Sequence, residues 1–333
     1  VIISVLLAYF EYGVIALSVR FILGSLLSSI LIFSYNPWLP KGFIRISSFK
    51  KLFSFGSNVM LLSIVNTISH NLHQVVIGKY FETAFLGFFN QGNMLKKNVT
   101  NTLNDTVMTV TFPILSKLQH DKTRLKSAYK RIMQVNSFTI FPVVTILIIS
   151  AEPLILGLLG EKWRGSIVFL QILTISGYVI HFHRINLNVL KVYGKGKHYL
   201  IQGVFRNGLT ILGIIIAVNI SVKAMAWAFV ITEFLQLFIN VYFSNKYIKF
   251  KFKEQFKIIF PIILLSISMA FFIYLISLYE FQIQIFKFIV LSFTGMAYYL
   301  SLAYLFKMKA LIEIISIIGS KFNSLKNKQF VKD

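Results

Sequence analysis

Cysteine is absent from the sequence, which excludes disulfide bonds, thiolate metal ligands and a cysteine nucleophile. Acidic residues are scarce, with 11 Asp and Glu against 34 Lys and Arg. The chain contains no phosphate-binding P-loop, which excludes an ATP-driven pump within it. It also contains no HExxH histidine pair, the zinc-binding motif of metalloproteases. His181 and His183 fall on different faces of a helix, which argues against a metal site. We therefore predict a protein that is not an enzyme, has no catalytic residues and needs no metal or cofactor.

Long uncharged runs are abundant. Apolar residues make up 56% of the 333 residues and charged residues 14%, and the mean hydropathy is +0.73. Soluble domains usually carry about 45–50% apolar and about 25% charged residues. Ile258–Leu278 and Ile132–Ala151 contain no charge and are each long enough to cross a bilayer. Because lipid cannot satisfy free backbone groups, these runs predict an all-α polytopic membrane protein.

Hydropathy and helix-breaking residues predict nine full transmembrane helices after a partial first one. The partial span covers Val1–Phe10, and the full spans are Val14–Ser34, Leu52–His73, Ala84–Leu115, Ile132–Ala151, Ser166–Leu190, His198–Val218, Ala224–Ser244, Ile258–Leu278 and Ile285–Phe306. Val1 is not methionine and lies inside an apolar run. We therefore expect a truncated chain that lacks the N-terminal helices, and we expect residues 1–333 alone not to transport.

The connecting loops alternate in charge. Loops on one side hold 24 of the 34 basic residues, whereas the opposite loops hold five, namely Lys79, Lys162, Arg164, Lys223 and Lys287. The positive-inside rule places the basic loops and the C-terminus in the cytoplasm. We expect these basic residues to contact anionic lipids at the cytoplasmic face, and we expect no nucleic-acid partner.

Five spans carry polar residues at helical spacing, so each has a polar face. These stripes are Asn66, His70 and His73; Asn90, Asn93, Lys97, Asn101 and Asn104; Gln171, Thr174, Tyr178, His181, Arg184 and Asn188; Gln202, Arg206 and Thr210; and Glu233, Gln236 and Asn240. A charge at mid-span costs about 2.5–3.5 kcal/mol, so stripes on neighbouring helices predict a shared hydrated interior. Interhelical hydrogen bonds, worth about 0.6–2 kcal/mol each, are the alternative.

The predicted interior is positively charged. Five basic residues fall within spans: Arg20, Lys96, Lys97, Arg184 and Arg206. The main candidates for buried acids are Asp105 and Glu233, and with His70 and His73 they are also candidates for ion coupling, although packing explains each equally well. Arginine presents a planar fork that suits phosphate oxygens, whereas snorkelling to the cytoplasmic interface is the alternative for Arg184 and Arg206. A positive interior favours an anionic substrate.

Six short segments, in their order and spacing, carry a family resemblance. They are Ser54-Phe-Gly, Val76-Ile-Gly-Lys79, Leu86-Gly-Phe-Phe-Asn90, Thr111-Phe-Pro-Ile-Leu-Ser116, Leu159-Gly-Glu-Lys-Trp163 and Leu190-Lys-Val-Tyr-Gly-Lys195. The chain thereby resembles the polysaccharide and O-antigen flippases, the Wzx-like and teichuronic-acid-type branch of the multidrug/oligosaccharidyl-lipid/polysaccharide exporter superfamily. The resemblance covers roughly residues 5 to 245, and the last two helices match only in hydropathy.

This resemblance implies two six-helix lobes, often with an extra helix pair, that work by alternating access. On that map, residues 1–34 end the N-terminal lobe, 35–50 form a cytoplasmic inter-lobe loop and 51–245 form the C-terminal lobe. Residues 246–257 are a basic cytoplasmic loop, 258–306 the extra pair and 307–333 a basic cytoplasmic tail.

The leading hypothesis, which the resemblance implies together with the positive interior, is translocation of an undecaprenyl-diphosphate-linked oligosaccharide across the bacterial cytoplasmic (inner) membrane. Such an oligosaccharide is an O-antigen, capsule or exopolysaccharide repeat unit. The predicted binding residues for diphosphate and sugar are Lys97, Arg184, Arg206, Lys96, Arg20, Asn90, Asn93 and Asn101. Lys97 is favoured over Lys96 because the asparagine stripe runs through it, whereas Lys96 points about 100° away. The alternatives are multidrug efflux, which predicts acidic pockets, and a scaffold that docks the polysaccharide polymerase or ligase.

Overall fold

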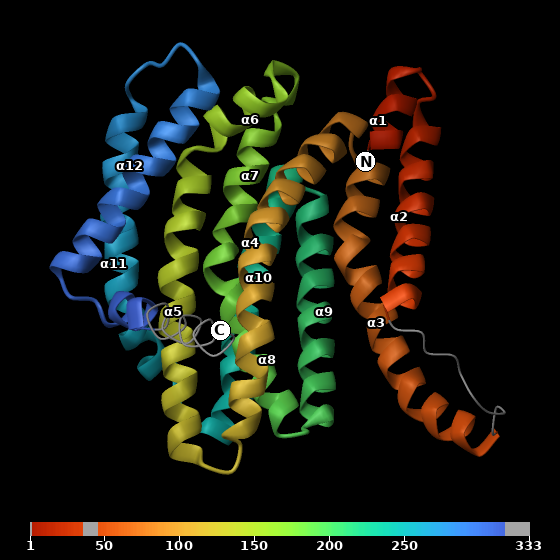
Figure 1. The fold of residues 1–333 in the computed structure, drawn as a ribbon, viewed down its shortest axis with the longest axis vertical. Helices are drawn as coiled ribbons and strands as arrows, with labels where there is room; N and C mark the ends of the chain where they lie inside the picture. The colour runs from red at the N-terminus through yellow and green to blue at the C-terminus, as the bar shows by residue number, and fades with distance from the viewer. Residues whose placement is uncertain (1, 36–45, 317–333) are drawn as a thin grey trace, which may run out of the picture. The chain divides into compact units, whose positions relative to one another are not determined.

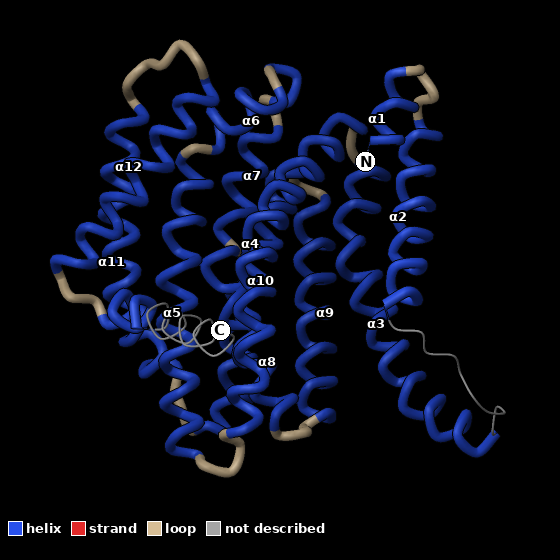
Figure 2. The backbone as a smooth tube through the Cα atoms, in the orientation of Figure 1, coloured by secondary structure: helices blue, strands red, loops and turns tan. Residues whose placement is uncertain are grey.

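The computed structural model describes residues 2–35 and 46–316, and all regular structure in these residues is helical (Figures 1 and 2). The chain divides into two compact units, Val1–Val59 and Met60–Asp333. The first unit holds α1 (Ile2–Tyr9), α2 (Val14–Tyr35) and the start of α3 (Ile46–Tyr80). The prediction of an all-α polytopic membrane protein is confirmed.

The second unit holds the end of α3 and a bundle of helices joined by short loops (Figure 2). After α3 come α4 (Thr83–Lys117), α5 (Lys122–Ile149), α6 (Ala151–Leu159), the 3-10 turn η1 (Glu161–Trp163), α7 (Ser166–Ile175), α8 (Gly177–Val192), α9 (Gly196–Val218), α10 (Val222–Ile248), α11 (Phe252–Ser277) and α12 (Gln284–Leu305). Side-chain caps begin two of these helices. Asp121 accepts from the backbone N–H groups of Thr123 and Arg124 at α5, and Ser221 accepts from Ala224 N–H at α10.

Seven segments of the described residues are long and apolar enough to span a membrane: Ser18–Tyr35, Lys122–Ile149, Ser166–Val192, His198–Val218, Val222–Ile248, Phe252–Ser277 and Gln284–Leu305. They agree with seven of the nine predicted full spans. The other two, in α3 and α4, lie on helices of 35 residues each. Their polar stripes lower the hydropathy, which is why hydropathy alone does not select them.

The predicted span Ser166–Leu190 is interrupted in the structure, because α7 ends at Ile175 and α8 begins at Gly177. Ser176 lies at this break, and its hydroxyl donates to the backbone oxygen of Leu173 at 2.7 Å. Such a bond from serine back to its own helix competes with the helical pattern and commonly bends it. The break matters because Lys96 reaches it from α4.

Three apolar cores of described residues hold the second unit together, of which the smallest joins α5, α6 and α7 and the other two are larger. The largest joins α5, α8, α11 and α12 around Tyr129, Met133, Ile185, Met269 and Tyr299, all fully buried. The remaining core joins the end of α3 to α4, α7, α9 and α10. Polar residues gather between the helices of this second group, where α10 packs against α8 and α9, and α4 packs against α7 and α8.

Candidate functional site

A cavity of about 510 Å³ lies among α3, α4, α7, α8, α9 and α10, and all of its lining residues belong to the second unit. Polar side chains dominate its lining, which is Thr67, Asn71, His73, Gln74, Phe89, Asn93, Lys96, Lys97, Leu173, Ile180, His183, Arg184, Leu187, Gln202, Arg206, Phe229, Glu233, Gln236 and Asn240. A hydrated interior shared by several helices is what their polar stripes predicted.

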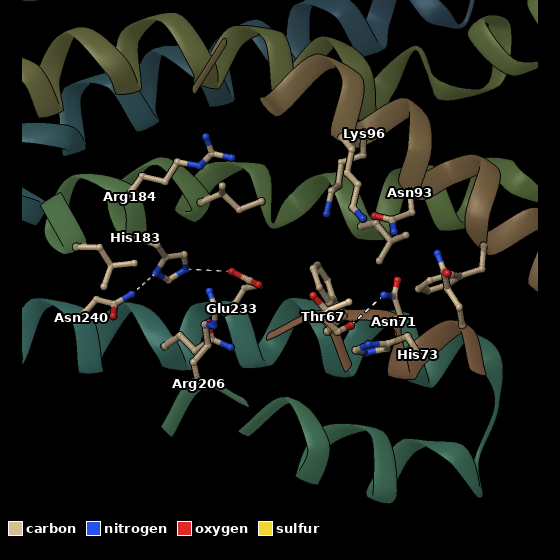
Figure 3. A pocket seen from close by; sticks show the side chains of 18 of the residues that line it. Thr67, Asn71, His73, Asn93, Lys96, His183, Arg184, Arg206, Glu233 and Asn240 are labelled. Carbon is tan, nitrogen blue, oxygen red and sulfur yellow. Dashed lines mark hydrogen bonds and ion pairs between the residues drawn. The ribbon is translucent and has the colours of Figure 1, made fainter. Parts of the chain in front are cut away.

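Four cations line this cavity from three helices. Lys96 and Lys97 come from α4, Arg184 from α8 and Arg206 from α9. Figure 3 shows Lys96, Arg184 and Arg206 around the space in which Glu233 and His183 meet. The structure therefore brings together four of the five cations that the sequence places within spans. The fifth, Arg20, is exposed on α2 in the other unit.

Lys96 is the most enclosed of these cations, with 2% of its surface exposed. Its Nζ lies 3.4 Å from the Ser176 hydroxyl at the α7–α8 break and 4.5 Å from the centre of the Phe229 ring. A cation over an aromatic face gains about 0.5–2 kcal/mol, which offsets part of the cost of burial. Gly92, one turn earlier on α4, permits this reach, because a Cβ there would lie 2.7 Å from the backbone nitrogen of Leu170 on α7.

Glu233 is the only acid among the described residues that line the cavity. Its Oε2 lies 3.1 Å from His183 Nε2, and its carboxylate also interacts electrostatically with Lys96 and Arg206. The other ring nitrogen of His183, Nδ1, lies 2.6 Å from the amide nitrogen of Asn240 (Figure 3). Four cations against one acid leave an excess of three positive charges. Such a cavity attracts anions and repels cations.

The remaining predicted site residues are distributed as follows. Asn93 and His73 line the cavity, and the His73 ring packs edge-on against Phe229, with ring centres 5.6 Å apart. Asn90 does not line it, and its side-chain oxygen is buried with no hydrogen-bond partner among the described residues. The side chains of His70, Asn101 and Asp105 lie outside the described part of the structure.

The polar residues of the broken span do not all face the same way: some contact α5, and others line the cavity. Tyr178 and His181 face α5, where they hydrogen-bond to Thr145 at 2.7 Å and to Ser137 at 3.0 Å. Arg184 instead lines the cavity. Interhelical hydrogen bonding, the alternative left open by the sequence, therefore accounts for part of this stripe.

His183 lines the cavity but was not among the predicted site residues. A signal for it exists in the sequence, since Ile180, His183, Arg184 and Leu187 follow the i, i+3, i+4, i+7 spacing of one helix face and all line the cavity. Assigning the face through His181 and Arg184 obscured this pattern.

A smaller charged cluster lies outside the spans, at η1. Arg164 forms ion pairs with Glu161 on the same turn and, at 3.0 Å, with Glu152 on α6. The hydrogen bond from Arg164 lowers the pKa of the Glu161 carboxyl below its usual value. This cluster ties the turn to α6.

Residues 1–168 match a family model described as polysaccharide biosynthesis protein. The chain belongs to this family. The resemblance to polysaccharide flippases that the short segments carry is confirmed.

Curated proteins with similar sequences come from several bacteria. The chain is 24% identical over 246 residues to the teichuronic acid biosynthesis protein TuaB of Bacillus subtilis, covering 73% of this chain and 50% of TuaB. It is 26% identical to the succinoglycan biosynthesis transport protein ExoT of Rhizobium meliloti, covering 68% of this chain and 46% of ExoT. The lipopolysaccharide biosynthesis protein WzxC of Escherichia coli is 26% identical over 48% of this chain and 34% of WzxC. The chain thus spans half or less of the length of these relatives.

A solved structure shares the fold. The lipid II flippase MurJ, in an inward closed conformation, superposes with a TM-score of 0.74 at 20% identity, covering 92% of this chain and 64% of MurJ. This similarity establishes a fold of the MurJ type. Family and fold together describe a multi-pass membrane protein, and among its relatives ExoT is named a transport protein and MurJ a flippase.

Proposed function

We propose that this protein belongs to a flippase that moves an undecaprenyl-diphosphate-linked oligosaccharide across the bacterial cytoplasmic membrane without catalysing a reaction. The observation that carries the proposal is the cavity, which four cations and a single acid line among the described residues. A diphosphate carries about two negative charges and cannot enter hydrocarbon unpaired. A cationic, hydrated cavity between helices supplies the pairing that this passage requires.

Within this cavity the cations have different tasks. Arg184 and Arg206 capture the diphosphate, since a guanidinium can donate two parallel hydrogen bonds to phosphate oxygens. Lys97 holds the diphosphate at mid-membrane, and Asn93, one turn away on the same helix, donates to sugar hydroxyls. Residues 51–245 act as the C-terminal lobe and residues 258–306 as an extra helix pair, with the basic loops and the C-terminus in the cytoplasm.

Two other functions fit less well. Multidrug efflux favours acidic pockets because its substrates are mostly cations, whereas this cavity has an excess of positive charge. A scaffold for the polysaccharide polymerase or ligase needs no charged cavity, so the placement of Lys97, Arg184 and Arg206 favours transport.

Complementation tests the proposal. We expect the intact protein to restore surface polysaccharide in a bacterium that lacks its own flippase, and not to confer resistance to cationic dyes. Dye resistance without restored polysaccharide contradicts the proposal. Flux of lipid-linked oligosaccharide in liposomes, under a pH gradient and a voltage imposed separately, identifies the driving force.

A further inference from the structure

Glu233 lies where the positive charge of the cavity converges. From α8 it meets His183 at 3.1 Å, with Arg184 on the same cavity wall. Lys96 and Lys97 face the cavity from α4, and Arg206 faces it from α9. From α3, His73 packs against Phe229, one turn before Glu233 on α10.

A carboxylate carries the same sign of charge as an anionic ligand and therefore weakens the binding of that ligand. A fixed negative charge a few ångströms from a phosphate repels it, and the repulsion is stronger in a protein interior than in water. A glutamine at position 233 could offer hydrogen bonds to His183 without this repulsion. The acid therefore has a use that a neutral side chain lacks.

Building on the proposed function, we propose that Glu233 is an internal counter-anion that the substrate diphosphate displaces, and that it yields its place by binding a proton. In the empty cavity its carboxylate lies 3.1 Å from His183 Nε2 and interacts electrostatically with Lys96 and Arg206. When the diphosphate binds, its phosphate oxygens replace the carboxylate as partners of Lys96 and Arg206. Glu233 then accepts a proton and becomes neutral. The diphosphate and the proton thus bind together, and each strengthens the binding of the other.

His183 is built to deliver that proton. With Asn240 donating its amide N–H to Nδ1, the ring carries its proton on Nε2, which faces Glu233. The amide oxygen of Asn240 is buried and has no hydrogen-bond partner among the described residues. If Nδ1 takes up a proton from water and the amide turns over, this oxygen accepts from the proton on Nδ1 while Nε2 gives its own proton to the carboxylate. The ring is then neutral again, so Asn240 can serve His183 before and after the transfer.

A second space gives protons an approach to Glu233 that the substrate does not block. A cavity of about 40 Å³ adjoins the carboxylate and is lined by Ser69, His73, Arg206, Asn207, Thr210, Phe229, Glu233 and Gln236. It is polar and large enough for water, because one water molecule needs about 10–15 Å³ of such space and two to four polar partners. It is too small for a sugar or a diphosphate.

Binding of inorganic pyrophosphate to the intact purified protein, measured at several pH values, tests the inference. In the wild type we expect tighter binding as the pH falls. Glu233→Gln should bind roughly tenfold tighter or more near neutral pH, because one repulsive charge is gone, and should lose the part of the pH dependence that Glu233 supplies. The slope that remains in Glu233→Gln comes from the histidines and from pyrophosphate itself. Glu280→Gln is the matched control, since this exposed acid follows α11 and does not line the cavity.

A measurement on the wild type covers the case in which Glu233→Gln does not fold. Infrared difference spectra should show the C=O stretch of a protonated carboxyl group when pyrophosphate is added. Tight binding without that band, or equal affinity and pH slope in the wild type and Glu233→Gln, overturns the inference while leaving the anion site in place. Failure of the wild type to bind pyrophosphate at any pH overturns the proposed anion site itself and, with it, this inference.

Discussion

His181 and His183 stand two positions apart on α8 and serve opposite sides of the helix. His181 Nε2 lies 3.0 Å from the Ser137 hydroxyl on α5, in a fully buried contact. His183 Nε2 lies 3.1 Å from Glu233 on α10, at the wall of the cavity. One histidine therefore joins helices, and the other belongs to the electrostatics of the proposed substrate site.

His181→Ala should destabilise the protein without abolishing transport by the molecules that fold. An interhelical hydrogen bond in a membrane protein contributes about 0.6–1.7 kcal/mol, and the space left by the ring adds to the loss. We expect a lower melting temperature in detergent and less protein in the membrane, with unchanged transport per molecule. Ser137→Ala should show the hydrogen-bond part of this effect alone. Full abundance with lost transport in His181→Ala contradicts the structural assignment.

Lys97→Ala should abolish surface polysaccharide and leave the amount of protein in the membrane unchanged. Lys97 lines the cavity and is partly exposed, so its removal takes a charge from the proposed substrate and leaves no buried ion-pair partner among the described residues. Lys96→Ala should instead lower membrane abundance as well, because Lys96 is buried against Ser176, Phe229 and the charge of Glu233. Immunoblots of membranes and staining of surface polysaccharide measure the two effects. Normal transport by Lys97→Ala, or greater loss per molecule in Lys96→Ala, contradicts the role given to Lys97.

Arg184→Lys should reduce transport more than conservation of charge predicts. An ammonium group is a compact, strongly hydrated point charge and cannot make the two parallel hydrogen bonds of a guanidinium. We expect weaker binding of pyrophosphate, and transport intermediate between the wild type and Arg184→Ala. Arg131→Lys is a suitable control, because Arg131 pairs with Glu313 away from the cavity. If Arg184→Lys matches the wild type in both assays, charge alone accounts for the role of Arg184.

The sequence predicted the helices and the cations of the cavity but not the partners of its side chains. Uncharged runs long enough to cross lipid leave little choice but helix, so most spans could be located. Helical spacing also identified the polar faces that carry Lys97 and Arg206. Which neighbour a face meets depends on packing between helices far apart in the sequence. That is why His181 could not be assigned to α5, and why the pairing of His183 with Glu233, 50 positions later, was not foreseen.

Gly92→Ala should disturb the site from a distance. The added Cβ would lie 2.7 Å from the backbone nitrogen of Leu170, so α4 and α7 would have to move apart. Such overpacking typically costs about 1–3 kcal/mol, and here it also carries Lys96 away from Ser176. Gly208→Ala on α9 is the matched control, because a Cβ there meets nothing within 4 Å. There the substitution should be neutral or stabilising by up to about 1 kcal/mol. Equal melting temperatures for the two variants contradict the close approach of α4 and α7.

The ion pairs of Arg164, which lie outside the predicted spans, should make the stability of the protein depend on pH. Arg164 hydrogen-bonds to Glu161 and lowers the pKa of that carboxyl. Because the pKa is lower in the folded state, the stabilisation is fully present above the ordinary pKa of glutamate. It is lost as the pH falls through the lowered value, where Glu161 takes up a proton. Arg164→Ala should therefore lower the melting temperature at neutral pH and have no such effect at a pH below that value.

The size of this effect should be small and should shrink with salt, since the pair is exposed. Thermal unfolding of the wild type and Arg164→Ala across a pH series, at low and high salt, measures it. Lys162→Ala removes a cation from the same turn that makes no ion pair among the described residues, and it should change the melting temperature equally little at every pH. A difference between the wild type and Arg164→Ala that grows toward acid pH has the wrong sign for a lowered glutamate pKa. A difference that is the same at every pH would mean that Arg164 stabilises the turn through packing with α6 rather than through its charge.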